Sequence, residues 1–512
     1  MKKILKIFII ICLFFYGCSN LIKIASKKNT KTITPNTTVS NGNSQLIELN
    51  INEKIKNKIN SNILGVNTGF TFKEPIEQNN DFLYFYKQLN PRVVRFPGGT
   101  IGNYYHPNKY GYGFTQKVVL TSRNFGPLSK LQIEKKPDIL NAFITLCKAN
   151  NASAIYVVNV YDEGTPEEMI YVINKLKENN IKVLGVELGN ELNLVGHRNE
   201  YPDAKTYANS IRPFAEAAHK FFPDVPVGVI TEGPFNAAEI KTQRGKFFHQ
   251  WNLDLAKEDF FDAFVLHSYT RCDDCLKNSN FDLLFETTNE TQINFLNTYF
   301  ENITTYYKNI IGSDKKIWMT ECNVGKWQVF FENTQYQANY EMKFLIRLIK
   351  SNITSTDFID IMNWHFIGAN GLIFGSKGQV MERETRGNFR TSSEYFPFYY
   401  MSKAIDKEAY AIESNFTNND LADFLVVENS KGEKYLLFVN SNAYELQLNI
   451  NSNWKAKNID YLYSDYIYSI GGFTYFTKNY PSKINSIKYD NKDINSKNII
   501  IPKYSTGIIE LE

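Results

Sequence analysis

The 512-residue chain is poor in the side chains that most often bind metals or form disulfide bonds, with only six histidines and six cysteines. The histidines are scattered, and neither a His-x-x-x-His pair nor an acidic cation-binding loop occurs. These absences argue against a metal-dependent hydrolase or lyase, and we expect no metal site.

The chain also lacks a strong charge of either sign, because 57 lysines and arginines face 53 aspartates and glutamates, a net charge of +4. Three of the lysines, Lys2, Lys3 and Lys6, lie in an N-terminal segment that we expect to be removed, and subtracting them leaves +1. A nearly neutral chain gives no reason to expect nucleic acid as a partner.

The apolar run near the N-terminus, Ile7 to Tyr16, has ten residues and is too short to cross a bilayer as a helix. Lysines precede it and Gly17-Cys18 follows it, an arrangement that resembles a bacterial lipoprotein signal. The resemblance implies a signal peptide over residues 1–17, a lipid on Cys18, and an exported protein anchored to a membrane, in the periplasm or at the cell surface. An ordinary signal peptide with an incidental cysteine is the alternative.

Residues 18–44 are rich in lysine, asparagine, threonine and serine and contain no acidic residue. Such a stretch buries too little apolar surface to offset the entropy of ordering it, so we expect a flexible tether.

Few cysteines remain in the rest of the chain, and only Cys272 and Cys275 are close in sequence. In an exported protein this pair is a candidate disulfide bond. Free thiols are one alternative, and a metal site, for which no second pair of ligands is suitably spaced, is the other.

Residues 63–400 alternate between short apolar, β-branched runs and longer segments of helical periodicity, which indicates βα units around a parallel sheet. Eight runs are candidate strands, the number that closes a (β/α)8 barrel of the TIM type, so we predict an α/β fold. The candidates are Ile63–Gly69, Val93–Phe96, Ala154–Val160, Val183–Leu188, Val225–Thr231, Ala263–Tyr269, Lys316–Glu321 and Phe358–His365.

Residues 401–512 show a different pattern, with short alternating segments separated by asparagine, aspartate, serine and glycine turns. This pattern predicts a C-terminal antiparallel β-sandwich domain. Residues 45–62 begin with a similar alternation, and we expect them to add a strand to that domain.

Two glutamates end predicted strands of the barrel. Glu191 follows the fourth strand in Gly189-Asn190-Glu191, and Glu321 ends the seventh. Since the carboxyl ends of barrel strands meet at one mouth, the two side chains are expected to face each other there. Two facing carboxyl groups are what glycoside hydrolysis requires, one to protonate the leaving oxygen and one to attack the anomeric carbon.

The chain resembles the clan A glycoside hydrolases, and within the clan the α-L-arabinofuranosidase, β-xylosidase and heparanase/β-glucuronidase groups. The resemblance is carried by Arg95-Phe96-Pro97-Gly98-Gly99, Gly189-Asn190-Glu191, His267-Ser268-Tyr269, Thr320-Glu321-Cys322-Asn323-Val324 and Pro502-Lys503-Tyr504-Ser505-Thr506-Gly507.

The resemblance implies a retaining hydrolase of a plant or algal poly- or oligosaccharide, with Glu191 as acid/base and Glu321 as nucleophile. Arg95 and Tyr269 would keep Glu321 ionised and oriented, and Asn190 would bind the hydroxyl next to the anomeric carbon. This mechanism needs no cofactor.

Two further residues are candidates for substrate binding. His267 faces the same mouth if the register of its strand is as predicted, and a hydrogen-bonded barrel histidine is the alternative. Trp364, near the end of the eighth strand, is a candidate sugar platform, and a buried core tryptophan is the alternative.

Two other functions compete with an arabinofuranosidase-like activity. One is an endo-acting polysaccharide hydrolase of the same clan. The other is a carbohydrate-binding surface lipoprotein that has lost catalysis, and such a protein would usually have replaced one of the two glutamates.

Overall fold

The computed structural model describes residues 45–68, 78–108, 113–114, 138–270, 295–324, 333–365, 372–375, 385–386, 389–417, 422–465 and 487–512. The predicted signal peptide and tether, Cys18, and the Cys272/Cys275 pair lie outside these residues. Among the helices that are described, none is long and apolar enough to span a membrane.

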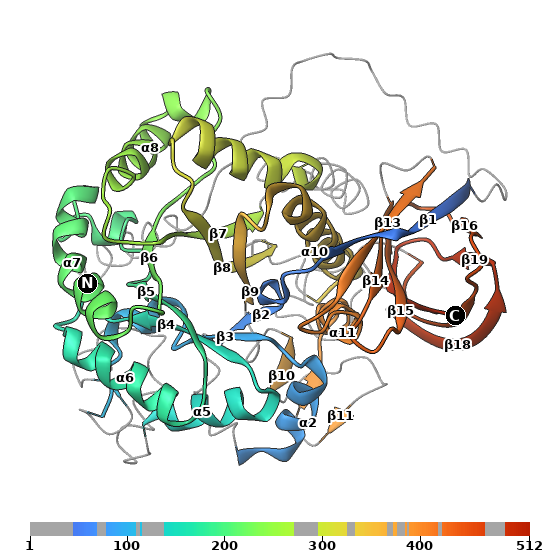
Figure 1. Cartoon of the computed structure of the whole chain (residues 1–512), viewed down its shortest axis with the longest axis horizontal. Coiled ribbons are helices and arrows are strands. Elements are labelled where there is room, and N and C mark those ends of the chain that lie inside the picture. The colour runs from blue at the N-terminus through green and yellow to red at the C-terminus, as the bar shows by residue number, and fades with distance from the viewer. Residues whose placement is uncertain are drawn as a thin grey trace, which may run out of the picture.

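Eight parallel strands close into a barrel, which confirms the predicted fold class (Figure 1). All eight candidate runs supply a strand, and the observed bounds differ from the predicted ones by a few residues at most. The strands are β2 (Gly65–Asn67), β3 (Val93–Phe96), β4 (Ser153–Val158), β5 (Val183–Leu188), β6 (Val227–Ile230), β7 (Ala263–Thr270), β8 (Lys316–Val324) and β9 (Ile359–His365).

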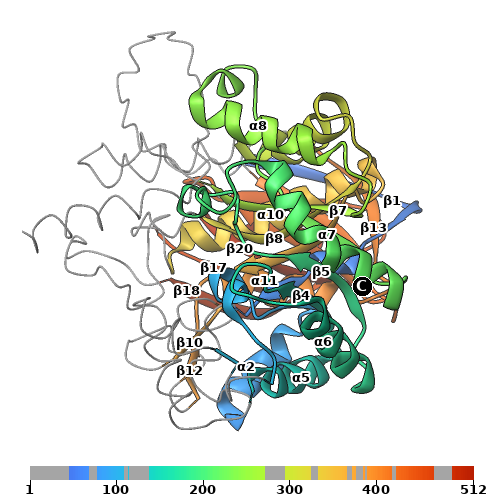
Figure 2. The same cartoon turned by 90° about the vertical axis from the view of Figure 1, so that its left-hand side faces the viewer.

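Helices cover the outside of the barrel (Figures 1 and 2). In α6 the Thr165 side chain and the Glu168 side chain cap each other's backbone amides, and a proline occupies the first turn. The helices are α2 (Asn80–Leu89), α5 (Ile139–Asn150), α6 (Pro166–Glu178), α7 (Ala204–Phe221), α8 (Gln243–Leu255), α10 (Gln335–Ser355) and α11 (Tyr395–Ala404).

A single tryptophan fills the middle of the barrel. Trp318 of β8 is buried and packs with inward-facing side chains that include Val93, Ile155 and Val265. A Cβ atom on Gly185 or on Gly228 would lie 2.2 Å or 2.6 Å from the indole ring. Glycine on β5 and β6 therefore makes room for the ring, and the interior below the mouth is a packed core.

The C-terminal domain is a nine-stranded sheet with one parallel pair, β1 with β16, and otherwise antiparallel pairing. Its two outermost strands, β18 and β19, are joined by Lys497 alone, so the sheet curls back on itself around an apolar interior. Its strands are β1 (Gln45–Lys58), β13 (Tyr410–Phe416), β14 (Ala422–Glu428), β15 (Lys434–Asn440), β16 (Leu446–Asn451), β17 (Ala456–Tyr463), β18 (Lys488–Ser496), β19 (Asn498–Ile501) and β20 (Ser505–Leu511).

The sheet packs on the barrel through α10 and α11. Alternate residues of β14 face opposite ways: Phe424 and Val426 point into the sheet's own interior, whereas Leu425 and Val427 join the core shared with the barrel. A smaller three-stranded sheet, formed by β10 (Ile373–Gly375), β11 (Thr385–Arg386) and β12 (Phe389–Thr391), lies near α2.

Candidate active site

The predicted site residues meet at the carboxyl ends of the barrel strands. Arg95 comes from β3, Asn190 and Glu191 follow β5, His267 and Tyr269 lie on β7, and Glu321 lies on β8. In a barrel this end is where catalytic residues gather, because side chains from different strands converge there.

A β-bulge turns Glu321 toward the mouth. Strict alternation from the inward-facing Trp318 would point Thr320 inward and Glu321 outward. Between these positions the pairing of β8 with β7 slips, so that Val265 opposes Trp318 but His267 opposes Glu321. The extra residue in β8 reverses the alternation beyond it and re-aims the carboxylate.

Arg95, Asn67 and Tyr269 hold the Glu321 carboxylate, which is almost completely buried. Arg95 Nη1 donates to Oε1 at 2.8 Å, Asn67 Nδ2 donates to the same oxygen at 3.3 Å, and the Tyr269 hydroxyl donates to Oε2 at 2.5 Å. Donors on both oxygens and a guanidinium charge favour the ionised carboxylate that a nucleophile needs.

Arg95 is itself fully buried and links the two sides of the mouth. It donates through Nε and Nη2 to both oxygens of Glu187, at 2.8 and 2.6 Å, and through Nη2 to Asn190 Oδ1 at 2.9 Å. Burial raises the pKa of Glu187, but Arg95 and His267 outweigh it and leave that pKa below its ordinary value. Glu187, which was not a predicted site residue, is thus the structural counterion of Arg95.

The turn after β5 presents Glu191 to the mouth. Gly189 and Glu191 both have positive φ, 86° and 52°, so the chain turns sharply around Asn190. Asn103 fixes this turn from the segment after β3: its Nδ2 donates to the Asn190 carbonyl at 2.8 Å, and its Oδ1 accepts from the Asn190 amide at 2.7 Å.

His267 lies between three carboxylates. Its Nδ1 is 3.0 Å from Glu191 Oε1 and 3.8 Å from Glu321 Oε2, and its Nε2 is 3.7 Å from Glu187 Oε1. Burial lowers the pKa of the imidazole, but the carboxylates outweigh burial and raise that pKa to about 10. His267 is therefore a cation at neutral pH that donates to Glu191.

The cluster contains two cations, Arg95 and His267. It also contains three acids, Glu187, Glu321 and Glu191, so its net charge is zero when one of the three carboxyl groups carries a proton. Glu191 is the most exposed of the three, at 23% of its side chain. One ligand atom each of Glu191, His267 and Glu321 lies within 4.8 Å of the other two. This spacing brings the two proposed catalytic carboxyl groups close together, and a cation could also occupy it.

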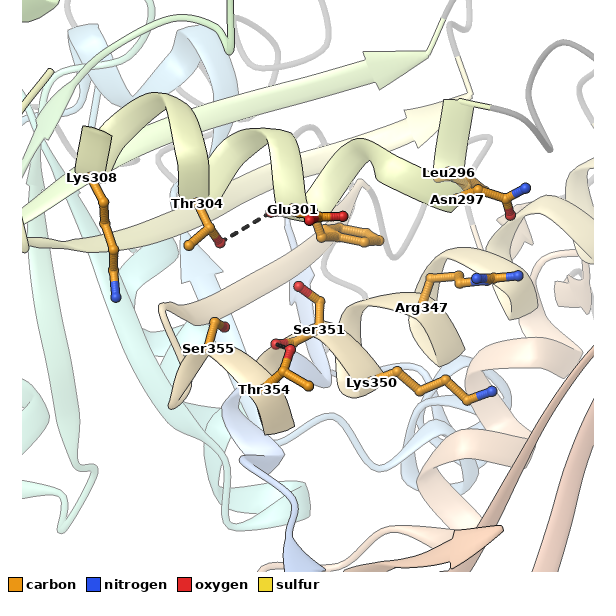
Figure 3. Close-up of a pocket in the computed structure, with 11 residues that line it drawn as sticks. Leu296, Asn297, Glu301, Thr304, Lys308, Arg347, Lys350, Ser351, Thr354 and Ser355 are labelled. Carbon is orange, nitrogen blue, oxygen red and sulfur yellow. Dashed lines mark hydrogen bonds between the residues drawn. The ribbon is translucent and has the colours of Figure 1, made fainter. Parts of the chain in front are cut away.

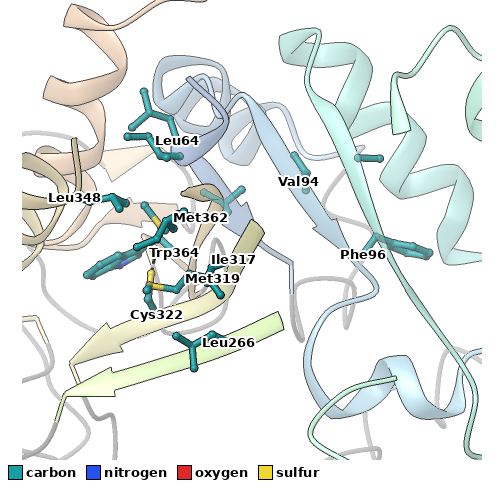
Figure 4. Close-up of a cluster of buried hydrophobic side chains, with 14 of the residues drawn as sticks. Leu64, Val94, Phe96, Leu266, Ile317, Met319, Cys322, Leu348, Met362 and Trp364 are labelled. Atoms are coloured by element: carbon teal, nitrogen blue, oxygen red, sulfur yellow. Dashed lines mark hydrogen bonds between the residues drawn. The ribbon is translucent and has the colours of Figure 1, made fainter. Parts of the chain in front are cut away.

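The prediction of Trp364 as a sugar platform is wrong. Ile361 of β9 packs with Trp318 in the barrel interior, so the alternation of the strand points Trp364 outward to the helices. The Trp364 ring is fully buried in the hydrophobic core (Figure 4). It lies between Tyr340 and Phe344, and its Nε1 donates to Glu394.

Cys322, next to the proposed nucleophile, points outward as well. Its Sγ lies 3.2 Å from Met362 Sδ, and burial raises the pKa of the thiol well above its ordinary value (Figure 4). The side chain is part of the core and does not face the mouth.

Three residues of the mouth were missed from sequence. Asn67 ends β2 and Asn103 follows β3, and nothing in the composition around them distinguishes an active-site asparagine from a turn residue. Glu232 follows β6, and the argument that selected Glu191 and Glu321, a carboxylate at a strand end, applies to it as well.

A groove of about 520 Å³ lies elsewhere, on the outside of the barrel (Figure 3). Its walls are the helical residues 295–305 and the C-terminal half of α10, with Lys308 at one end and Arg347 and Lys350 at the other. None of its residues belongs to the mouth.

No protein-family model and no curated protein sequence matches the chain. Solved structures do. A family 51 α-L-arabinofuranosidase from Bifidobacterium longum has a TM-score of 0.64 at 14% identity, over 92% of this chain and 100% of that one.

Two more structures are similar over nearly the whole of both chains. The family 51 α-L-arabinofuranosidase from Thermotoga petrophila has a TM-score of 0.62 at 15% identity, over 92% of this chain and 100% of that one. A family 44 xyloglucanase from Paenibacillus polymyxa has a TM-score of 0.55 at 11% identity, over 91% and 100%. Both families belong to clan A, so the predicted resemblance to that clan is confirmed for the fold.

Proposed function

We propose that the protein is a retaining glycoside hydrolase. The observation that carries the proposal is the pairing of Glu191 with Glu321 across the barrel mouth, one oxygen of each lying within 4.8 Å of the other. Retaining enzymes place their carboxyl groups about 5–5.5 Å apart, whereas inverting enzymes leave about 6.5–9.5 Å for a water molecule.

In the first step a Glu321 oxygen attacks the anomeric carbon while the bond to the leaving oxygen breaks. Glu191 donates its proton to that oxygen, and His267, which donates to Glu191 Oε1, orients the carboxyl group for this transfer. Asn190, whose Oδ1 accepts from Arg95, turns its amide donor toward a sugar hydroxyl. In the second step ionised Glu191 takes a proton from water, which attacks the anomeric carbon and frees Glu321.

The substrate class is part of the proposal, and the structural neighbours support it. They include an α-L-arabinofuranosidase and a xyloglucanase. We propose a plant or algal poly- or oligosaccharide, cleaved in an arabinofuranosidase-like manner, with endo-acting hydrolysis as the second candidate.

The test is hydrolysis of a panel of aryl glycosides, arabinan and xyloglucan by residues 45–512, compared with Glu191→Gln and Glu321→Gln. Turnover lost in both variants, and kept by the surface control Glu178→Gln on α6, supports the proposal. Turnover abolished by EDTA would instead assign Glu191, His267 and Glu321 to a metal. Glycan binding without any turnover would favour the binding lipoprotein.

We also propose that the protein is an exported lipoprotein anchored through Cys18. The N-terminal sequence supports this. Labelled palmitate should be incorporated by the full chain and not by Cys18→Ser, and equal labelling of both would refute the anchor.

A further inference from the structure

A fourth carboxylate lies at the mouth, and the proposed mechanism does not use it. Glu232 follows β6, is 8% exposed, and has one hydrogen-bonding side chain among the described residues, Arg244, at 3.3 Å. Buried carboxylates normally have several short hydrogen bonds, because an unsatisfied buried charge is costly. Glu232 therefore has unused capacity to accept hydrogen bonds.

The backbone of Glu232 is held rigidly, in contrast to its side chain. Asn252 donates to its carbonyl at 2.5 Å and accepts from its amide at 3.3 Å, and the Tyr307 hydroxyl donates to the same carbonyl at 3.1 Å. Arg244 lies over the Phe248 ring at 4.9 Å. Both members of the pair are thus positioned in advance for a ligand.

Glu232 lies on the side of the mouth that carries Glu191, because β6 pairs with β5 and Asn193 Nδ2, two residues after Glu191, donates to the Thr231 carbonyl at 3.5 Å. In keeping with this placement, burial raises the pKa of Glu232 to about 7, Arg244 and His267 oppose this rise, and the charge of Glu191 adds to it. Since the leaving oxygen lies against the proton donor, the group attached to that oxygen extends toward this side of the mouth.

We infer that Glu232 and Arg244 bind neighbouring hydroxyl groups of the sugar on the leaving-group side of Glu191. The carboxylate accepts from one hydroxyl and the guanidinium donates to the next, which a charged acceptor and donor 3.3 Å apart are spaced to do. This inference rests on the proposed function, and it makes a saccharide, rather than a simple aglycone, the preferred leaving group.

The experiment compares two substrates with the same glycone: an oligosaccharide and an aryl glycoside, which lacks a leaving-group sugar. In Glu232→Gln the ratio of kcat/KM for oligosaccharide over aryl glycoside should fall about tenfold or more, since a hydrogen bond to a charged group is lost. Glu258→Gln is the matched control, because Glu258 pairs with Arg212 at 2.6 Å in the helical layer. An unchanged ratio in Glu232→Gln overturns the inference.

A pH profile separates binding from a structural role. In the wild type the ratio of kcat/KM for oligosaccharide over aryl glycoside should rise with pH around 7 as Glu232 ionises. The charged groups that act on Glu232 are Arg244, His267 and Glu191. Glu232→Gln should abolish the rise. If the wild type hydrolyses nothing, the proposed function fails, but the inference can still be tested by binding. Calorimetry would compare the affinity for arabinan and xyloglucan oligosaccharides of Glu321→Gln with that of the double variant Glu321→Gln/Glu232→Gln. Equal affinities would refute it.

Discussion

At the residue scale, the proposed chemistry depends on how five buried or partly buried ionisable groups share charge. Arg95 pairs with both Glu187 and Glu321, and His267 donates to Glu191. The nucleophile must be ionised and the proton donor must be protonated, although the two carboxyl groups lie a few ångströms apart. Arg95 and His267 together carry two positive charges, which balance two ionised carboxylates and leave the third carboxyl group to carry a proton.

His267→Gln tests this charge balance. Loss of the cation should reduce kcat about 10–100-fold, because the proton donor loses its orienting hydrogen bond. In the wild type kcat should also fall as the pH rises through about 10, where His267 loses its proton, and His267→Gln should lack this alkaline limb. An alkaline limb that is the same in both proteins would contradict the role of His267. A melting curve checks that the variant is folded.

At the element scale, the strand ends could be predicted from sequence, but their fine register could not. Apolar runs located β5 and β8, and therefore the two glutamates. The bulge in β8 depends on how β7 and β9 pair with it, and these contacts have no local signal in the sequence. Trp364 was misplaced for a related reason, since the face on which a strand residue lies is decided by the register of the whole barrel.

Helix α10 contains a buried acid that should make stability depend on pH. Neither oxygen of Glu341 has a hydrogen-bond partner among the described residues, and burial, with the charge of Glu394, raises the pKa of Glu341 well above its ordinary 4.5. The folded state therefore keeps a proton that the unfolded state releases above about pH 4.5. Stability is fully present below that pH and declines as the pH rises toward the folded-state pKa.

Glu341→Gln keeps the shape of the side chain and removes its titration. The change that it causes in the free energy of unfolding should be more favourable at pH 8 than at pH 4, by about 1–3 kcal/mol. Urea denaturation at both pH values measures this difference. An equal effect at the two pH values would show that Glu341 is ionised in the folded protein.

At the scale of the whole molecule, one buried carboxylate joins the barrel to the sheet. Asp423 of β14 lies 2.7 Å from Lys343 Nζ and 2.6 Å from Arg347 Nε, both on α10. Burial raises the pKa of Asp423, but Lys343 and Arg347 outweigh it and leave that pKa below its ordinary 3.8. This contribution to stability is present above about pH 3.8 and is lost as the pH falls through the folded-state pKa.

Asp423→Asn should lower the free energy of unfolding by about 3–5 kcal/mol, because Lys343 would remain buried without its carboxylate. Glu428→Gln, which removes the more exposed partner of Lys56, should cost at most about 1 kcal/mol. Urea denaturation compares them, and similar losses in the two variants would mean that the buried pair does not hold the domains together.

The division into barrel and sheet could be predicted from sequence because the apolar period changes near residue 400. The sheet's curl and its packing on α10 could not, since both faces of β14 are apolar and periodicity alone does not say which face meets the barrel. Asp423, the second residue of this strand, gives no sign in the sequence that its partners, Lys343 and Arg347, lie far earlier in the chain.

The most direct test of the central claim is the anomeric configuration of the first product, followed by proton NMR on any substrate that is turned over. The account predicts retention in the wild type. In Glu191→Ala, added azide should restore turnover and give a glycosyl azide of retained configuration, because azide attacks the intermediate on Glu321 without needing a base. Inversion in the wild type would contradict the assignment of Glu321 as nucleophile.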